Sequence, residues 1–205
     1  MKTSGTVYTI IFTFITAFFF IAILAAANEF TRPRIELNQQ LTLQQAVLRA
    51  GGISFTADTE VNQLFTTRVS RPLPDQPDLY VLKNDAEQTV YALRFTGQGL
   101  WGTITGILAV DASIRSVTGV EVIAHNETPG LGGKIDAEYF KAQYYGERIG
   151  PDGTLRMGTA GPGDKDHTNS RVDGISGATR TSELFGGIIN HGLAQIRQLA
   201  GEVTE

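Results

Sequence analysis

Residues 79–124 read LYVLKNDAEQTVYALRFTGQGLWGTITGILAVDASIRSVTGVEVIA. Four runs in this stretch are apolar and rich in β-branched residues, and polar or glycine-containing segments separate them: 79–82, 89–95, 101–110 and 117–124. Short runs of this kind, bounded by turn residues, predict β-strands. Glycines inside such runs are typical of bulges or of places where another group approaches the backbone closely. We therefore expect a sheet built from this stretch.

Helical patterns come mainly after these strands. In residues 182–199 the apolar side chains recur with a period near 3.6, which predicts an amphipathic helix: Leu184, Ile188, Ile189, Leu193, Ile196 and Leu199. Residues 136–145 predict a shorter helix, and residues 150–169 form a long polar segment that we expect to be a short hairpin or a mobile loop. Because strands precede helices instead of alternating with them, the order predicts an α+β domain.

The N-terminal segment is apolar enough to cross a membrane. Residues 7–27 read VYTIIFTFITAFFFIAILAAA, with no charged residue, proline or glycine. About twenty such residues span the hydrocarbon core as a helix. A cleaved signal peptide is the alternative, but the apolar stretch is longer than the usual signal core. We expect a retained membrane helix that ends near Pro33, because proline interrupts helices.

These patterns divide the chain into four parts: a tail (1–6), a transmembrane helix (7–27), a connecting helical region (28–76) and one folded domain (77–205). Within the connecting region, residues 36–50 suit a helix that stops at Gly51 and Gly52. This helix is either a plain connector, which we favour, or a docking element for a partner.

The composition excludes several classes of function. The chain has no cysteine, which excludes disulfides, cysteine-held iron–sulfur clusters and a catalytic cysteine. Its three histidines lie far apart without metal-ligand spacing, so we predict no metal site. The formal net charge is -4 and no Lys/Arg-rich run is present, which argues against nucleic acid as a partner.

The first motif is DGISGAT, from Asp173 to Thr179, immediately before the predicted last helix. Serine and threonine at such a position are ordinary helix caps. The start of a helix also offers free N–H groups and the positive end of its dipole, which favour a phosphate. The residues alone leave both interpretations open.

The second motif is HNETPGLGGK, from His125 to Lys134. Proline followed by glycines after a β-run predicts a turn, so the segment is at least a tight connection. It also combines exposed backbone N–H groups with a carboxylate, a hydroxyl, a lysine and an apolar side chain. That set suits a planar heteroaromatic ring with polar edges.

Together the two motifs, with GLWG at residues 99–102 as a third, resemble the FMN-binding domain family. Both family signatures are complete here: Asp173, Ser176, Gly177, Ala178 and Thr179 in one, and Glu127 through Gly132 in the other. Within the family, the single anchor and GLWG make the chain most similar to the C subunits of Na⁺-translocating NADH:quinone reductases (Nqr). The G subunit of Rnf complexes, or an FMN domain of another extracytoplasmic reductase, is the alternative. The resemblance covers the anchor and residues 79–205, and residues 36–76 match no motif.

The resemblance implies FMN joined by a phosphoester to Thr179 and placed there by an ApbE-like flavin transferase, for which Asp173 and Ser176 are recognition residues. It implies further cofactor contacts from the three motifs: Trp101, Glu127, Thr128, Gly130, Leu131, Gly132, Lys134, Ser176, Gly177 and Ala178. Leu131 is expected to contact the ring; Trp101 either packs nearby or belongs to the core.

The implied fold is α+β, with a twisted, mainly antiparallel sheet and flanking helices. The implied role is electron relay within an Nqr- or Rnf-type complex, without catalysis by this chain alone. The chain would cross the inner membrane once and carry the FMN domain on the extracytoplasmic side.

Overall fold

The computed structural model describes residues 3–204. This part of the chain forms two compact units, one ending at Gln40 and the other beginning at Leu41. The boundary falls inside helix α1 (Thr3–Ala50), whose earlier residues make up the first unit. By length and composition, Gly5–Ala50 is a candidate membrane span: its most apolar window has a mean hydropathy of 2.7 and is not buried.

Helix α1 does not end near Pro33, so that expectation is wrong. The helix includes Pro33 and continues to Ala50. A proline inside a helix removes one backbone hydrogen bond, here the one that the Glu29 carbonyl would accept. The side chains around this point are exposed, and Arg32 forms ion pairs with Glu29 at 4.0 Å and Glu36 at 3.0 Å. The carbonyl that proline leaves without a donor therefore lies on an exposed part of the helix and not in a packed core.

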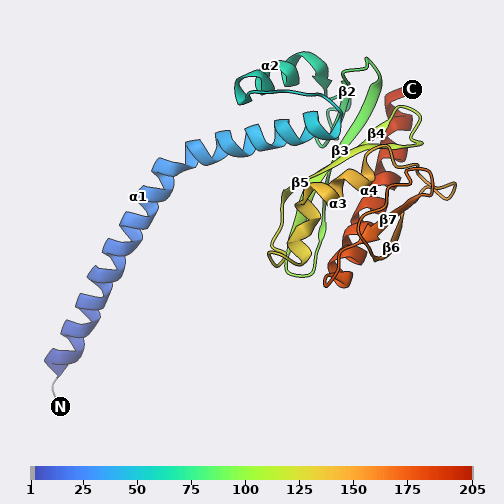
Figure 1. Ribbon diagram of the computed structural model, residues 1–205. Helices are drawn as coiled ribbons and strands as arrows, with labels where there is room; N and C mark the ends of the chain where they lie inside the picture. The colour runs from blue at the N-terminus through green and yellow to red at the C-terminus, as the bar shows by residue number, and fades with distance from the viewer. Residues whose placement is uncertain (1–2, 205) are drawn as a thin grey trace. The chain divides into compact units, whose positions relative to one another are not determined.

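The second unit is organised by a five-stranded antiparallel sheet (Figure 1). The strands follow one another in space as they do in sequence: β1 (Val69–Ser70), β2 (Leu79–Lys83), β3 (Thr89–Gln98), β4 (Thr103–Asp111) and β5 (Val117–Ala124). The four predicted runs correspond to β2 through β5, and the bounds of β5 agree with the prediction. The predicted α+β class with an antiparallel sheet is confirmed.

Helices cover both faces of this sheet. Helix α4 (Thr179–Thr204) packs on one face through apolar residues that include Phe185, Ile189 and Leu193. The end of α1 and helix α2 (Asp58–Arg68) pack on the other face, in a second apolar cluster. Because both faces are covered, the strands lack a clean alternation of polar and apolar residues: six of the nine residues of β4 are buried.

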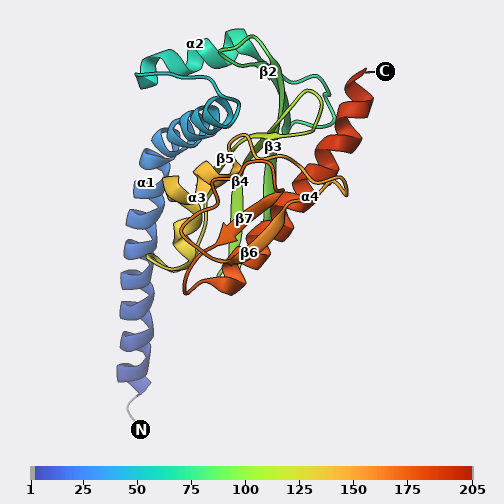
Figure 2. The ribbon, with the colours of Figure 1, turned by 45° about the vertical axis from the view of Figure 1, so that its right-hand side comes forward.

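Short elements connect β5 to α4: η1 (Gly132–Asp136), α3 (Glu138–Lys141), η2 (Ala142–Tyr144), β6 (Arg156–Ala160) and β7 (Arg171–Gly174). The predicted helix at 136–145 is therefore broken into a short α-helix and 3-10 turns. The polar segment 150–169 contains β6, which pairs in parallel with β7 (Figure 2). A hairpin within this segment was the wrong expectation, because a parallel pair needs a crossover instead of a tight turn.

The Phe185→Ala substitution tests the core beneath α4. The Phe185 ring is fully buried and lies 6.0 Å from the ring of Phe95, 5.7 Å from that of Phe140 and 6.1 Å from that of Tyr144. Removing it should lower the free energy of unfolding by about 3–5 kcal/mol. Urea titration of the detergent-solubilised chain measures this loss. Phe30→Ala is the control, since Phe30 is 80% exposed, and equal losses in the two variants would contradict this packing.

Candidate functional site

Three loops carry the three sequence motifs. Residues 99–102 form the turn between β3 and β4, in which the Gly99 N–H donates to the Gly102 carbonyl at 2.8 Å. Residues 125–131 connect β5 to η1, and residues 175–178 connect β7 to α4. These segments are far apart in sequence, and the structure brings them together around one carboxylate.

The Glu127 side chain joins the three loops. Its Oε1 accepts a hydrogen bond from the Trp101 backbone N–H at 3.0 Å, and its Oε2 accepts one from the Thr181 hydroxyl at 2.7 Å. Only 3% of Glu127 is exposed. One buried carboxylate therefore connects the β3–β4 turn, its own loop and the first turn of α4.

This carboxylate is stabilised in its charged form. Burial raises the pKa of Glu127, but hydrogen bonds from Thr181, Trp101 and Leu100, with the nearby His125, outweigh burial and hold the pKa below its ordinary value. His125 also fixes the loop, because its Nδ1 accepts the Glu127 N–H at 3.1 Å. Glu127 thus remains ionised at neutral pH and acts as an acceptor only.

Two glycines give the loops room to meet at Glu127. A Cβ atom on Gly132 would lie 2.7 Å from both Glu127 Oε2 and Thr181 Oγ1, and one on Gly99 would lie 2.5 Å from Glu127 Oε1. Neither position accommodates a side chain without displacing the carboxylate. The glycines of GLWG and ETPGLG therefore have a packing role.

Thr179 is the first residue of α4, but another residue fixes the preceding turn. The Ala178 N–H donates to the Ile175 carbonyl at 3.0 Å, and Gly177 adopts a positive φ of 79°. The Ser182 hydroxyl accepts the Ile175 N–H at 2.9 Å and donates to the Ala178 carbonyl at 3.0 Å. The Thr179 side chain is exposed, and within residues 3–204 its hydroxyl has no hydrogen-bond partner. The helix-cap interpretation of Thr179 is therefore not supported.

Large apolar side chains are exposed on the same loops. Leu100, Trp101 and Leu131 are 47%, 68% and 45% exposed, and none belongs to either core cluster. The alternative that Trp101 is a core residue is wrong. Leu131 lies against the turn before Thr179, because a Cβ on Gly177 would be 3.2 Å from Leu131 Cδ2.

The remaining predicted residues lie on the same loops or beside them. Thr128 is exposed, and its carbonyl accepts the N–H groups of Leu131 at 3.1 Å and Gly133 at 2.9 Å. Gly130 has a positive φ of 77°, and Lys134 is half-buried in η1.

Of the two residues expected to be read by a transferase, Ser176 is exposed on the turn. Asp173 is largely covered: its side chain is 13% exposed and forms an ion pair with Arg171 at 3.0 Å. Both residues belong to the segment that leads from β7 into α4.

Sequence reasoning missed Thr181 and Leu100. Thr181 is 54 residues away from its partner Glu127, and no local pattern predicts such a contact. Leu100 lies within the matched GLWG motif, so its exposure beside Trp101 could have been proposed from the sequence.

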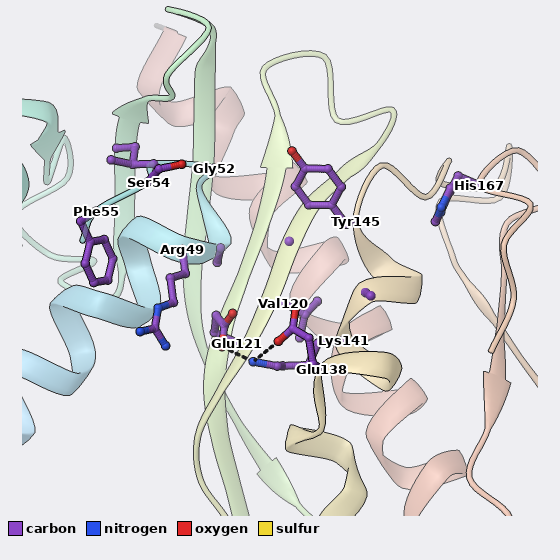
Figure 3. Close-up of a pocket in the computed structure, with 14 residues that line it drawn as sticks. Arg49, Gly52, Ser54, Phe55, Val120, Glu121, Glu138, Lys141, Tyr145 and His167 are labelled. Atoms are coloured by element: carbon purple, nitrogen blue, oxygen red, sulfur yellow. Dashed lines mark hydrogen bonds and ion pairs between the residues drawn. The ribbon is translucent and has the colours of Figure 1, made fainter. Parts of the chain in front are cut away.

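A groove of about 650 Å³ elsewhere in the second unit contains none of the predicted residues (Figure 3). It lies between the end of α1, β5 and α3. Lys141, at its centre, is paired with Glu121 at 2.7 Å and with Glu138 at 3.5 Å. Among the described residues, no group of three or more His, Cys, Asp or Glu side chains is arranged to hold a metal ion.

The loops around Glu127 define a site for a phosphate-bearing planar cofactor. The first turn of a helix suits the phosphate, and the exposed apolar side chains suit a ring. Comparison with known families agrees with this class: residues 99–194 match the FMN-binding domain. This part of the chain, which contains all three motifs, is therefore similar to the FMN-binding domain family.

Curated relatives indicate which kind of FMN-binding protein the chain resembles. The C subunit of the Na(+)-translocating NADH-quinone reductase of Pasteurella multocida is 35% identical over 106 residues, which cover 51% of this chain and 41% of the relative. The protein of the same name from Pseudomonas aeruginosa is 34% identical over 110 residues, covering 51% and 42%. The similarity thus spans about two fifths of the length of these relatives.

Solved structures support the fold. The crystal structure of Shewanella oneidensis NqrC aligns with a TM-score of 0.70 at 19% identity, covering 82% of this chain and 99% of that one. The C subunit of the Na(+)-translocating NADH-quinone reductase from Parabacteroides distasonis aligns with a TM-score of 0.66 at 22% identity, covering 82% and 96%. At these identities the likeness is evidence of a shared fold.

The Thr181→Val substitution tests the junction at Glu127. Valine keeps the shape of threonine but removes the donor, so Glu127 Oε2 loses its partner in a buried site. The free energy of unfolding should fall by about 1–3 kcal/mol. Thr103→Val is the control, since Thr103 is exposed at the start of β4. Equal stability of the two variants in urea titrations would show that the Glu127–Thr181 bond does not hold the loops together.

Proposed function

We propose that this chain carries FMN joined through its phosphate to the Thr179 hydroxyl, and that it relays electrons in a membrane-bound Nqr complex. The observation that carries the proposal is the exposed Thr179 hydroxyl at the start of α4, which has no hydrogen-bond partner within residues 3–204 and follows the turn that Leu131 lies against. At this position, the oxygens of a cofactor phosphate would accept hydrogen bonds from the free N–H groups at the start of a 26-residue helix. The positive end of the helix dipole would stabilise the negative charge of the phosphate.

The surrounding residues have distinct roles in this proposal. Leu131 and Trp101 would contact the apolar ring, and the backbone N–H groups near Thr128 and Gly130 would face its polar edge. Lys134 would place a positive charge near the ring. Glu127 and Gly132 would hold in place the loops that carry these contacts. FMN supplies the redox chemistry; the protein supplies position and electrostatics.

The attachment itself requires a separate flavin transferase of the ApbE type, which would move the FMN moiety of FAD to the Thr179 hydroxyl and release AMP. The turn of residues 175–178 suits this role, because Ser176, Gly177 and Thr179 are exposed while Ile175 and Ala178 are buried. A transferase would thus meet the hydroxyls and the glycine backbone. Asp173, held by Arg171, would support the turn from β7.

The Nqr assignment rests on the curated relatives, which carry the name of the C subunit of the Na(+)-translocating NADH-quinone reductase. We infer that the other Nqr subunits are the partners of this chain. Ion translocation would belong to the whole complex, because residues 7–27 carry no charged side chain that could form an ion path. A G subunit of an Rnf complex is the alternative, and neither the Pasteurella nor the Pseudomonas relative favours it.

Helix α1 would anchor the chain in the inner membrane. Large apolar side chains are exposed around the whole circumference of its first part, among them Phe12, Phe14, Phe18 and Leu24. A helix that is apolar around its whole circumference is stable in lipid, whereas in water the exposure of its apolar side chains is unfavourable. We place the FMN domain on the extracytoplasmic side, where a tethered flavin cannot be lost by diffusion.

The attachment site is tested by intact-protein mass spectrometry after co-expression with a flavin transferase. The wild type should gain the mass of one FMN less one water, and its yellow colour should survive denaturation. Thr179→Val should gain no mass, because the acceptor hydroxyl is gone.

Two controls separate attachment from damage to the turn. Ser176→Ala keeps the Thr179 acceptor but removes a hydroxyl that the transferase is proposed to meet, so it should still acquire FMN, in a smaller fraction of the chains. Loss of the adduct there together with its retention in Thr179→Val would move the attachment to Ser176. Circular dichroism of Thr179→Val should match that of the wild type, since the Thr179 hydroxyl has no partner in the described part of the chain.

Fluorescence tests the proposed contact between Trp101 and the ring. Trp101 is the single tryptophan of the chain, so its emission reports on this loop alone. Emission of the flavinylated protein should be at least about fivefold weaker than that of Thr179→Val, because a ring within stacking distance quenches indole. Equal emission would place the ring away from the β3–β4 turn. Unfolding both proteins in urea should remove most of the difference.

A further inference from the structure

A second groove, of about 770 Å³, is lined by three arginines: Arg115, Arg148 and Arg197. It is formed by the β4–β5 turn, residues 148–153, residues 168–170 and the last turns of α4. This is the end of the sheet away from Thr179, because β4 starts beside the GLWG turn and ends at Asp111, nine residues later. A nine-residue strand is ~30 Å long, so the proposed flavin phosphate does not reach this groove.

None of these three arginines has an acidic partner among residues 3–204. Arg68, Arg94, Arg171 and Arg180, by contrast, each pair with an aspartate or glutamate. In a chain with a formal net charge of -4, three guanidinium groups without a carboxylate partner among the described residues thus lie around one groove, whose lining includes one acidic residue, Asp152. Their mutual repulsion favours binding of an anion between them.

Hydrogen bonds fix the backbone segments that line the groove. The Ile149 N–H donates to the Arg115 carbonyl at 2.8 Å, and an isolated bridge pairs Ser116 with Arg148. The Arg197 guanidinium lies directly on Gly153, which is buried and has a φ of 84°; a Cβ at Gly153 would overlap it. Arg197 is thus held against the turn, which reduces the entropy that it loses on binding a ligand.

The acidic groups nearby are already engaged in their own turns. Asp152 lines the groove, but its Oδ1 accepts the Thr154 N–H at 3.1 Å. Asp111 accepts the Arg115 N–H at 2.8 Å and the Ser116 hydroxyl at 3.0 Å. Three cations and one anion line the groove, so it retains a positive charge.

We propose that this groove binds a phosphate-bearing anion with two or more charges. Guanidinium groups recognise phosphate oxygens with paired hydrogen bonds, and Ser170 adds a hydroxyl donor to the lining. The source is either a soluble polyphosphate or the headgroup of an anionic phospholipid. The site rests on the arginines alone and does not depend on the flavin proposal.

The test uses the full chain in lipid nanodiscs. In discs of zwitterionic phosphatidylcholine, calorimetry with inorganic pyrophosphate should show one saturable site. Arg115→Gln and Arg197→Gln should each weaken binding about tenfold, the loss expected for one charge-assisted contact. Arg94→Gln is the matched control: it removes the same charge from β3, outside the groove, and should change affinity less than about twofold.

A second arm identifies the source. In discs that contain cardiolipin, an anionic lipid whose headgroup carries two phosphates, native mass spectrometry counts the anionic lipids that the chain retains. Retention that falls in Arg115→Gln, together with weaker pyrophosphate binding in these discs, assigns the groove to a headgroup. Pyrophosphate binding that the anionic lipid leaves unchanged assigns it to a soluble phosphate.

The proposal is overturned if neither pyrophosphate binding nor lipid retention responds to Arg115→Gln and Arg197→Gln, or if Arg94→Gln has the same effect. If Arg197→Gln unfolds the turn at Gly153, Arg115→Gln decides the question alone, because the Arg115 side chain is exposed and forms no ion pair within residues 3–204. In all variants the covalent FMN content should match the wild type, which separates this groove from the site at Thr179.

Discussion

The arrangement of the proposed flavin site depends on one buried carboxylate. Glu127 has little contact with water, yet its charge is retained because Trp101 and Thr181 donate to its two oxygens. Loss of either donor would leave part of a negative charge unsatisfied in the interior, which is costly. The β3–β4 turn, the loop after β5 and the start of α4 are therefore fixed relative to one another by a shared acceptor. The exposed side chains on these loops keep a defined spacing as a result.

The sheet explains why such loops can be rigid. Helices bury both of its faces, so strands β3 and β4 are held along most of their length and their connecting turn has little freedom. Helix α4 packs across the sheet through Phe185. In its first turn, Thr181 donates a hydrogen bond to the Glu127 carboxylate. Loops that carry function commonly rest on a packed scaffold of this kind. Here the scaffold places two structurally separate features, the Thr179 turn and the arginine-lined groove, at opposite ends of β4.

Much of this fold is predictable from residues alone, and the failures have physical causes. Strands β2 to β5 are predictable because apolar runs end at turn residues, and α4 because its period is clear. Helix α2 escapes prediction because its sequence, DTEVNQLFTTR, is polar, with Val61 as its single fully buried residue. The parallel pairing of β6 with β7 escapes it because short polar strands carry no pattern that identifies a distant partner. Helix α1 passes through Pro33 because the proline lies at an exposed position, which the sequence does not reveal.

At the site, motif matching identifies Thr179 and Leu131, whereas only the three-dimensional structure reveals how they are held. The Ser182 hydroxyl and Glu127 fix the acceptor turn, and Glu127 lies on a loop 52 residues before Thr179 in the sequence. The turn therefore has its final shape only after distant parts of the chain have met. Any enzyme that reads this turn as a shape, and not as a string of residues, would have to wait until folding is complete. For such an enzyme, folding would be a precondition of flavin attachment. A chain that had failed to fold would receive no flavin and would therefore be colourless.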